Sequence, residues 1–277
     1  AKFLAISGII LPMLPHKNLI PDINLTPYSI WLATVVVSGI SYLSYLLKRY
    51  VFHESGTLVS GIIGGLYSST ATISVLARKS RKASEQEATD YVAAMLLAVS
   101  MMFLRFMILI LIFSREIFLS IYPYLLTMAV VAAIVAWFIH SRQKRPEGQS
   151  AETEEDDSSN PLEFKVALIF AILFVIFTFL THYTLVYAGT GGLNLLSFVS
   201  GFSDITPFIL NLLQNTGTVA ALIITACSMQ AIISNIMVNM FYALFFAGKG
   251  SKLRPWILGG FGVVIACNLV LLLFFYI

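Results

Sequence analysis

Long apolar runs bounded by short basic segments are the feature that most limits how this chain can fold. A helix needs about 20 apolar residues to cross a bilayer. The runs of about that length are Tyr28–Leu47, Thr89–Phe113, Ile117–Ile139, Leu162–Ala188, Thr218–Ala247 and Pro255–Ile277. With 58% hydrophobic and 11% charged residues among 277, the chain has too little polar surface for a water-soluble globule of this size. The sequence therefore predicts an all-α polytopic membrane protein.

Two segments outside these runs are expected to separate the parts of the chain. The chain begins inside an apolar stretch, and Lys2–Leu14 is too short to cross a bilayer. We therefore expect residues 1–24 to be a truncated first helix and a loop, with a further region upstream. The stretch His140–Pro161 is strongly polar, with basic residues followed by acidic ones, which is typical of a solvated linker. We place that linker at residues 141–158.

A polar, glycine-containing motif occurs twice. The first copy lies in Leu58–Lys82 and the second in Asn194–Asn211. At an offset of 136 positions, the matched pairs are Gly65 with Gly201, Ser68 with Asp204, Thr70 with Thr206, and Ala71 with Pro207. Thr206 before Pro207 is typical of an N-cap followed by a proline at the first helical position. We therefore predict Thr206 as an N-cap and Thr70 as the equivalent cap, each opening the second part of an interrupted helix.

The similarity extends beyond the two motifs. Ser100 and Arg105 match Ser234 and Asn239 at an offset of 134. Tyr122-Pro123-Tyr124 matches Arg254-Pro255-Trp256 at 132. Landmarks in the same order with nearly constant spacing indicate an internal repeat. We predict repeat 1 at residues 25–140 and repeat 2 at residues 159–277.

The positions of lysine and arginine favour inverted repeats. If both motifs crossed the membrane, the better orientation would leave nine basic residues inside and seven outside. If both motifs are re-entrant, each repeat has three crossing helices, and only Lys17 and Arg115 lie outside. The fourteen on the inner side are then Lys2, Lys48, Arg49, Arg78, Lys79, Arg81, Lys82, Arg142, Lys144, Arg145, Lys165, Lys249, Lys252 and Arg254. A strong bias of this kind marks the cytoplasmic side.

Re-entrant segments from opposite faces would bring the two motifs together near the bilayer midplane, as in many secondary transporters. The predicted substrate-binding residues are Ser68, Ser69, Thr70, Thr72, Asp204, Thr206, Arg105, Asn235 and Asn239. Three alternatives stay open at this point. The small residues of the motifs can serve only close helix packing; Asp204 can cap the following half-helix; and Arg105 can snorkel toward the interface.

Several segments together resemble a known bacterial membrane family. They are FLAISGIILPMLPHKN from Phe3, TPYSIW from Thr26, GGLYSSTAT from Gly64, GFSDITP from Gly201 and SNIMVN from Ser234. The family is the domain of unknown function that follows an MgtC/SapB-like domain in longer proteins. The resemblance implies such a domain upstream and supplies no substrate. Relatives often carry a second aspartate and an alanine where this chain has Thr206 and Pro207, and a lysine at Asn239.

Three classes of function are compatible with this pattern. The first is a secondary transporter for a small ion or ionic solute, the second an ion channel, and the third a regulatory membrane subunit of MgtC/SapB type. No nucleophile and base set, phosphate loop or metal-ligand spacing occurs, so we expect neither an enzyme nor a cofactor. The expected location is the bacterial cytoplasmic (inner) membrane. The expected partners are the bilayer and a solute but no nucleic acid; a bound metal and a homo-oligomer are left open.

Overall fold

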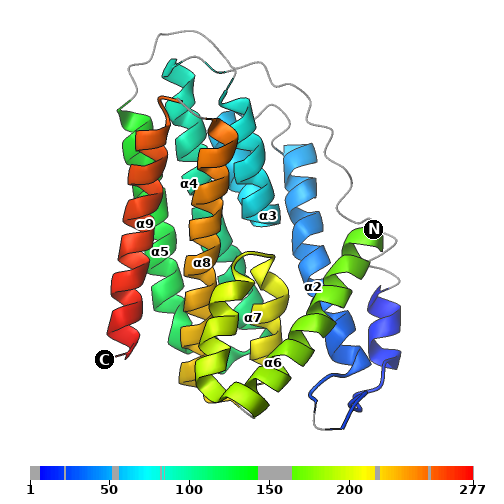
Figure 1. The fold of residues 1–277 in the computed structure, drawn as a ribbon. Coiled ribbons are helices and arrows are strands. Elements are labelled where there is room, and N and C mark those ends of the chain that lie inside the picture. Colours follow the sequence, from blue (N-terminus) through cyan, green and yellow to red (C-terminus); the bar gives the residue numbers. More distant parts are fainter. Residues whose placement is uncertain are drawn as a thin grey trace. The chain divides into compact units, whose positions relative to one another are not determined.

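The computed structural model describes residues 7–21, 23–51, 56–81, 83, 85–142, 164–215, 219–248 and 251–276. Within them the chain is helical, apart from turns and one isolated bridge between Ile20 and Ile23. The helices are η1 (Leu11–Met13), α2 (Pro27–Leu46), η2 (Leu47–Val51), α3 (Thr57–Lys79), α4 (Glu85–Phe113), α5 (Arg115–Ser141), α6 (Phe164–Ser200), α7 (Ile205–Gln214), α8 (Ala221–Ala247) and α9 (Arg254–Tyr276) (Figure 1). The predicted all-α fold is confirmed. Of the predicted linker 141–158, residues 143–158 lie outside the described part of the chain.

Local sequence explains several helix ends. Ser114 separates α4 from α5, and its Oγ accepts a hydrogen bond from the Ile117 amide, so it caps the start of α5. Arg78 and Lys79 lie in the last turn of α3, where cations stabilise the negative end of the helix dipole. Pro123 lies inside α5, and its carbonyl accepts a hydrogen bond of 2.6 Å from the Thr127 hydroxyl.

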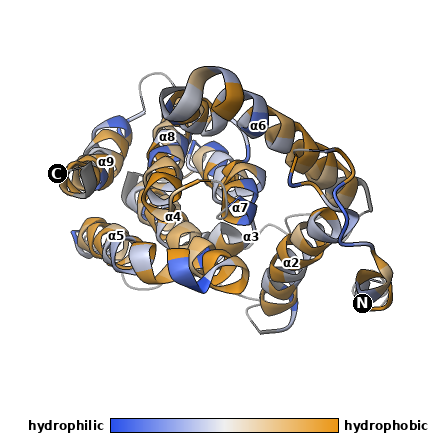
Figure 2. Cartoon of the chain, turned by 90° about the horizontal axis from the view of Figure 1, so that it is seen from below, coloured by the Kyte–Doolittle hydropathy of each residue, from blue (hydrophilic) through white to orange (hydrophobic). Residues whose placement is uncertain are grey.

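By length and composition alone, seven of the described helices are long and apolar enough to cross a membrane, namely α2, α3, α4, α5, α6, α8 and α9. Many of their large apolar side chains are exposed, including Val130, Ile134 and Trp137 of α5, the last with 68% of its surface exposed. Figure 2, which views the chain from below, shows many hydrophobic residues in orange on these helices. Such a surface is costly in water and normal against lipid acyl chains. The protein is therefore a polytopic helical membrane protein.

The chain forms two compact units. The first contains Ala1–Tyr42, Ile108–Ile121 and Asn160–Asn235, and the second contains Leu43–Met107, Tyr122–Ser159 and Ile236–Ile277. Each unit draws on both halves of the sequence, because the boundaries fall inside α2, α4, α5 and α8. These units are defined by contacts between residues, whereas the predicted repeats are defined by matching positions in the sequence. The units therefore do not test the repeats, and the repeat boundaries and their inverted relation stay predictions.

In the second unit, α4 is the most deeply buried part of the core. Its Val92, Met95, Leu96 and Val99 have no exposed surface. Two glycines of α3, Gly61 and Gly65, let this helix approach α4 closely. A Cβ atom added at Gly65 would lie 2.5 Å from the Cα of Ala98, a distance that real Cβ atoms do not show. Small residues four apart permit this kind of backbone contact between membrane helices.

In the first unit, α7 packs against α6. All residues from Ile205 to Leu213 are buried, and the rings of Phe177 and Phe208 lie 5.7 Å apart. The Asn211 amide donates a hydrogen bond of 2.7 Å to the hydroxyl of Thr178, and both side chains are almost fully buried. The short helix α7 is thus held in a core of its own unit.

Candidate functional site: two interrupted helical segments

The first motif contains a sharp break in α3. Ser68 has φ −159° and ψ 108°, which is an extended conformation inside a helical segment. A Cβ atom added at Gly64 would lie 2.4 Å from Thr72 Oγ1. In a straight helix, residues eight apart are separated by about 12 Å along the axis. The two arms of α3 therefore fold back on each other at Ser68, as expected for an interrupted segment.

Ser68 also caps the second arm. Its Oγ accepts a hydrogen bond of 3.3 Å from the Ala71 amide, the usual bond of an N-cap to the third helical residue. The prediction that Thr70 is the cap is therefore wrong. The helix restarts at Ser69, so Thr70 already lies in the second arm, where its carbonyl accepts a hydrogen bond from the Ser74 hydroxyl.

Arg105 of α4 bonds the carbonyl that this break releases. In an unbroken helix the Ala71 amide would bond the Tyr67 carbonyl, but here it bonds Ser68. The Arg105 Nη1 donates a hydrogen bond of 2.7 Å to the Tyr67 carbonyl, and the Arg105 side chain is only 8% exposed. The alternative in which Arg105 snorkels toward the interface is not supported, because its guanidinium bonds the Tyr67 carbonyl at the end of the first arm of α3.

The second motif breaks at the matching position. Here α6 ends at Ser200 and α7 begins at Ile205, with Asp204 as the N-cap. The Asp204 Oδ1 accepts a hydrogen bond of 2.9 Å from the Thr206 amide. The prediction that Thr206 is the N-cap before a proline at the first position is wrong by two residues. Pro207 is the third residue of α7, where its missing amide still costs no helical bond.

Asn235 of α8 bonds the carbonyls at this second break. Because Pro207 has no amide, it cannot bond the Ser203 carbonyl as residue 207 of a continuous helix would. The Asn235 Nδ2 lies 3.2 Å from the Gly201 carbonyl and 3.5 Å from the Ser203 carbonyl, and its side chain is 4% exposed. The second break therefore receives its donor from a long neighbouring helix, as the first does.

Glycine permits the close approach that this bond needs. A Cβ atom added at Gly201 would lie 2.3 Å from Ser234 Oγ, and that hydroxyl donates to the Phe198 carbonyl at 2.6 Å. The last turn of α6 is therefore held directly against α8 within the first unit. Any side chain at Gly201 would push the two helices apart.

The two motifs thus share a local arrangement at equivalent positions. Ser68 and Asp204 are both caps, and each preceding carbonyl, of Tyr67 and Ser203, bonds a side chain of a long helix. One detail differs from the sequence match, which paired Arg105 with Asn239. The residue that bonds the second break is Asn235, one turn earlier on α8.

The predicted site residues fall into the two units. The second unit contains Ser68, Ser69, Thr70, Thr72, Arg105 and Asn239, and the first contains Asp204, Thr206 and Asn235. Ser69, Thr206, Arg105, Asn235 and Asn239 are buried, Ser68, Thr70 and Thr72 are partly exposed, and Asp204 is exposed. Their convergence on one site stays a prediction. The alternative in which Asp204 caps a half-helix is confirmed, and it leaves the second carboxylate oxygen for other contacts.

Sequence reasoning missed two features of the first unit. The first is a bend at Gly189, with φ 60° and ψ −152°, which the glycines of residues 189–192 signalled. The second is a group of buried polar atoms in the first unit. Asn211 Oδ1, Thr181 Oγ1 and Thr225 Oγ1 are buried and have no hydrogen-bond partner among the described residues. The sequence signal for these buried atoms was the occurrence of polar residues three or four positions apart inside apolar helices.

Within the described residues, no three His, Cys, Asp or Glu side chains gather closely enough to hold a metal ion. The atoms around the two breaks are instead hydroxyls, amides, backbone carbonyls, one guanidinium and one carboxylate. Groups of these kinds can bind small polar or charged solutes by hydrogen bonds and by the partial charges of helix ends.

Comparison with known proteins places the chain in a family. A similar protein from Aquifex aeolicus (strain VF5), described as an uncharacterized protein, is 25% identical over 227 residues, covering 80% of this chain and 96% of the relative. No solved structure matches the chain. The model of the domain of unknown function DUF4010 matches residues 35–247, which include both interrupted segments. The chain belongs to the DUF4010 family.

Proposed function

We propose that the protein is a secondary transporter that moves a small ion or ionic solute across the bacterial inner membrane. The observation that supports this proposal most is the shared arrangement at Ser68 and Asp204. Each residue caps a half-helix, and each preceding carbonyl bonds a side chain of a long helix. Interrupted helices whose ends face a polar space are how many transporters bind solutes at membrane depth.

The chemistry of the breaks indicates which groups would contact the solute. The hydroxyls of Ser68, Ser69, Thr70 and Thr72 belong to one segment, and Asp204 and Thr206 to the other. In this proposal Asp204 contributes the charge, because one carboxylate oxygen bonds the Thr206 amide and the other is left for a cation or a proton. Arg105 acts differently: its bond to the Tyr67 carbonyl makes it a positioning residue for the first segment.

Two other functions are kept as alternatives to transport. A passive channel would use the same polar groups without a coupled change of conformation. A regulatory membrane subunit is favoured by the resemblance to proteins that carry an MgtC/SapB-like domain, and also by the tight glycine contacts, since these are sufficient for packing alone. We propose no catalytic activity and no cofactor for any of the three.

Solute flux into liposomes that contain only the purified protein tests the proposal. Cation and anion uptake would be measured with and without imposed proton and sodium gradients. We expect saturable uptake coupled to one gradient. Uptake that ignores both gradients and does not saturate would support a channel, and no uptake of any tested ion would support a regulatory subunit.

Two variants connect the flux to the site. Asp204→Asn removes the charge and retains a cap oxygen, so it should abolish coupled uptake while the protein still folds. The matched control is Glu116→Gln, which removes an exposed carboxylate in the first turn of α5. Normal coupled uptake by Asp204→Asn would exclude Asp204 from the transport site.

A further inference from the structure

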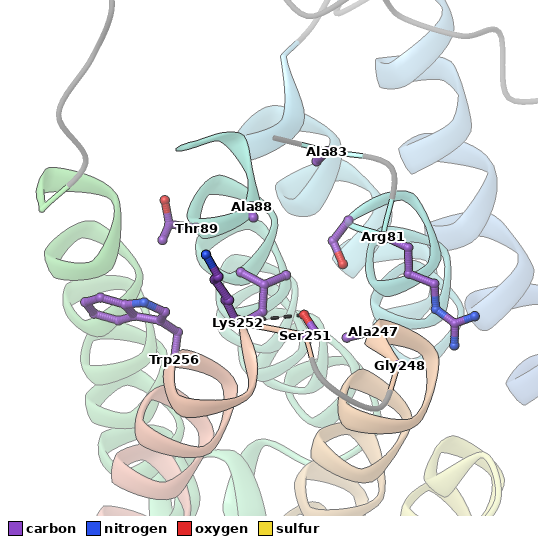
Figure 3. A pocket seen from close by; sticks show the side chains of 11 residues that line it. Arg81, Ala83, Ala88, Thr89, Ala247, Gly248, Ser251, Lys252 and Trp256 are labelled. Atoms are coloured by element: carbon purple, nitrogen blue, oxygen red, sulfur yellow. Dashed lines mark hydrogen bonds between the residues drawn. The ribbon is translucent and has the colours of Figure 1, made fainter. Parts of the chain in front are cut away.

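A cavity of about 810 Å³ opens in the second unit at the ends of four helices. Its walls come from the end of α3, the start of α4, the end of α8 and the start of α9 (Figure 3). The side chains that matter for its chemistry are Arg81, Thr89, Ser251, Lys252 and Trp256. None of the described residues that line it is acidic. The volume is in the range of sites that hold small organic ligands.

Among the described residues that line the cavity, Lys252 extends its amine into this space. In Figure 3 its amine extends away from the α8–α9 connection toward Ala88 and Thr89 at the start of α4, with Trp256 on the adjacent wall. The Thr89 hydroxyl, from α4, lies on the same side of the cavity. An ammonium group can donate charge-assisted hydrogen bonds to a phosphate oxygen.

Arg81 fixes the opposite wall. Its Nε donates to the Phe246 carbonyl and its Nη2 to the Phe245 carbonyl at 3.1 Å, so its guanidinium neutralises the C-terminal end of α8. Gly248, at φ 94°, allows the chain to turn there, and a Cβ atom at this position would lie 3.4 Å from Arg81 Nε. In Figure 3 the Arg81 guanidinium is directed away from Lys252. The wall is thus held in place while Lys252 faces the cavity.

The cavity also lies at the basic ends of membrane helices. Arg78, Lys79, Arg81, Lys252 and Arg254 all occur in this region, which the charge bias assigns to the cytoplasmic edge. Tryptophan is enriched at the level of lipid headgroups, and basic pockets between membrane helices on this side bind anionic headgroups. We propose that this cavity binds the phosphate of an anionic phospholipid, with Lys252 against the phosphate and Trp256 beside the glycerol backbone.

Fluorescence of Trp256 tests this proposal. The chain has 3 tryptophans, so Trp31→Phe with Trp137→Phe leaves Trp256 as the reporter. The protein would be placed in vesicles that contain brominated phosphatidylglycerol or, at the same mole fraction, brominated phosphatidylcholine. We expect at least twofold stronger quenching by the anionic lipid. Lys252→Gln should remove that preference, and Lys252→Arg should restore it.

Arg254→Gln is the matched control, because it removes a neighbouring exposed cation that does not line the cavity. It should keep the preference for phosphatidylglycerol. If Lys252→Gln and Arg254→Gln lose the preference equally, the preference is due to general surface charge, and the proposal is overturned. Equal quenching by the two lipids in the parent protein would also overturn it. If millimolar inorganic phosphate abolishes the preference, the cavity takes a soluble phosphate and the assignment to a lipid is wrong.

Discussion

The guanidinium of Arg105 donates a hydrogen bond of 2.7 Å to the Tyr67 carbonyl, the last backbone acceptor before the break in α3. A break inside a membrane helix releases backbone groups that lipid cannot bond, and each group left unbonded there costs several kcal/mol. Arg105 therefore has a structural role at this break, whatever the protein transports or binds.

Arg105→Met should destabilise the protein by about 1.5 to 3 kcal/mol, the typical worth of a hydrogen bond to a charged group. Thermal unfolding in detergent would measure the change. Arg115→Met is the control, because Arg115 is exposed at the start of α5, and it should shift the midpoint much less. Equal shifts in the two variants would contradict the bond to Tyr67.

Ser68→Ala and Asp204→Ala should each cost about 1 kcal/mol, because each removes a cap oxygen from a half-helix. Ser68→Asp should retain the stability of the parent protein. Hydrogen exchange would detect the loss as faster exchange at the Ala71 amide in the first case and at the Thr206 amide in the second. Ser74→Ala is the control, because its hydroxyl bonds only the Thr70 carbonyl of its own helix. Unchanged exchange in both cap variants would remove the proposed equivalence of the two breaks.

Gly65→Ala should destabilise the second unit by about 1 to 3 kcal/mol, the usual cost of overpacking, since its Cβ would lie 2.5 Å from the Cα of Ala98. Gly259→Ala is the matched substitution in α9, where a Cβ would meet nothing within 4 Å. That variant should be neutral or more stable, because alanine has the better helix propensity. The comparison of their unfolding midpoints checks both statements, and a stable Gly65→Ala protein would show that α3 can move away from α4.

The charge count predicts that Arg78 and Lys252 face the cytoplasm and that Arg115 faces the other side. Each would be replaced by cysteine in a protein that lacks Cys227 and Cys267, and a membrane-impermeant thiol reagent would be applied to either side. Arg78→Cys and Lys252→Cys should react only from the cytoplasmic side, and Arg115→Cys only from outside. Reaction of Lys252→Cys from outside would favour parallel repeats, because the motifs would then cross the membrane.

The helices of this protein were largely determined by local sequence. The run Tyr28–Leu47 became α2 at Pro27–Leu46, and the run Thr89–Phe113 lies within α4. Apolar length and flanking charge decide such spans, because a backbone in lipid must bond within its own segment. The glycine and hydroxyl residues of the first motif likewise predicted that its helix is interrupted, because they weaken a continuous helix and can bond the backbone groups that a break releases.

The position of each break was decided by tertiary structure. The preference for threonine before proline pointed to Thr206 as a cap, yet Asp204 has that role, because Asn235 of α8 bonds the carbonyls of Gly201 and Ser203 and so ends α6 there. In the same way Arg105 of α4 bonds the Tyr67 carbonyl and permits the turn at Ser68. A sequence states which residues are able to cap a helix, but the choice among them depends on where distant side chains can reach the released carbonyls.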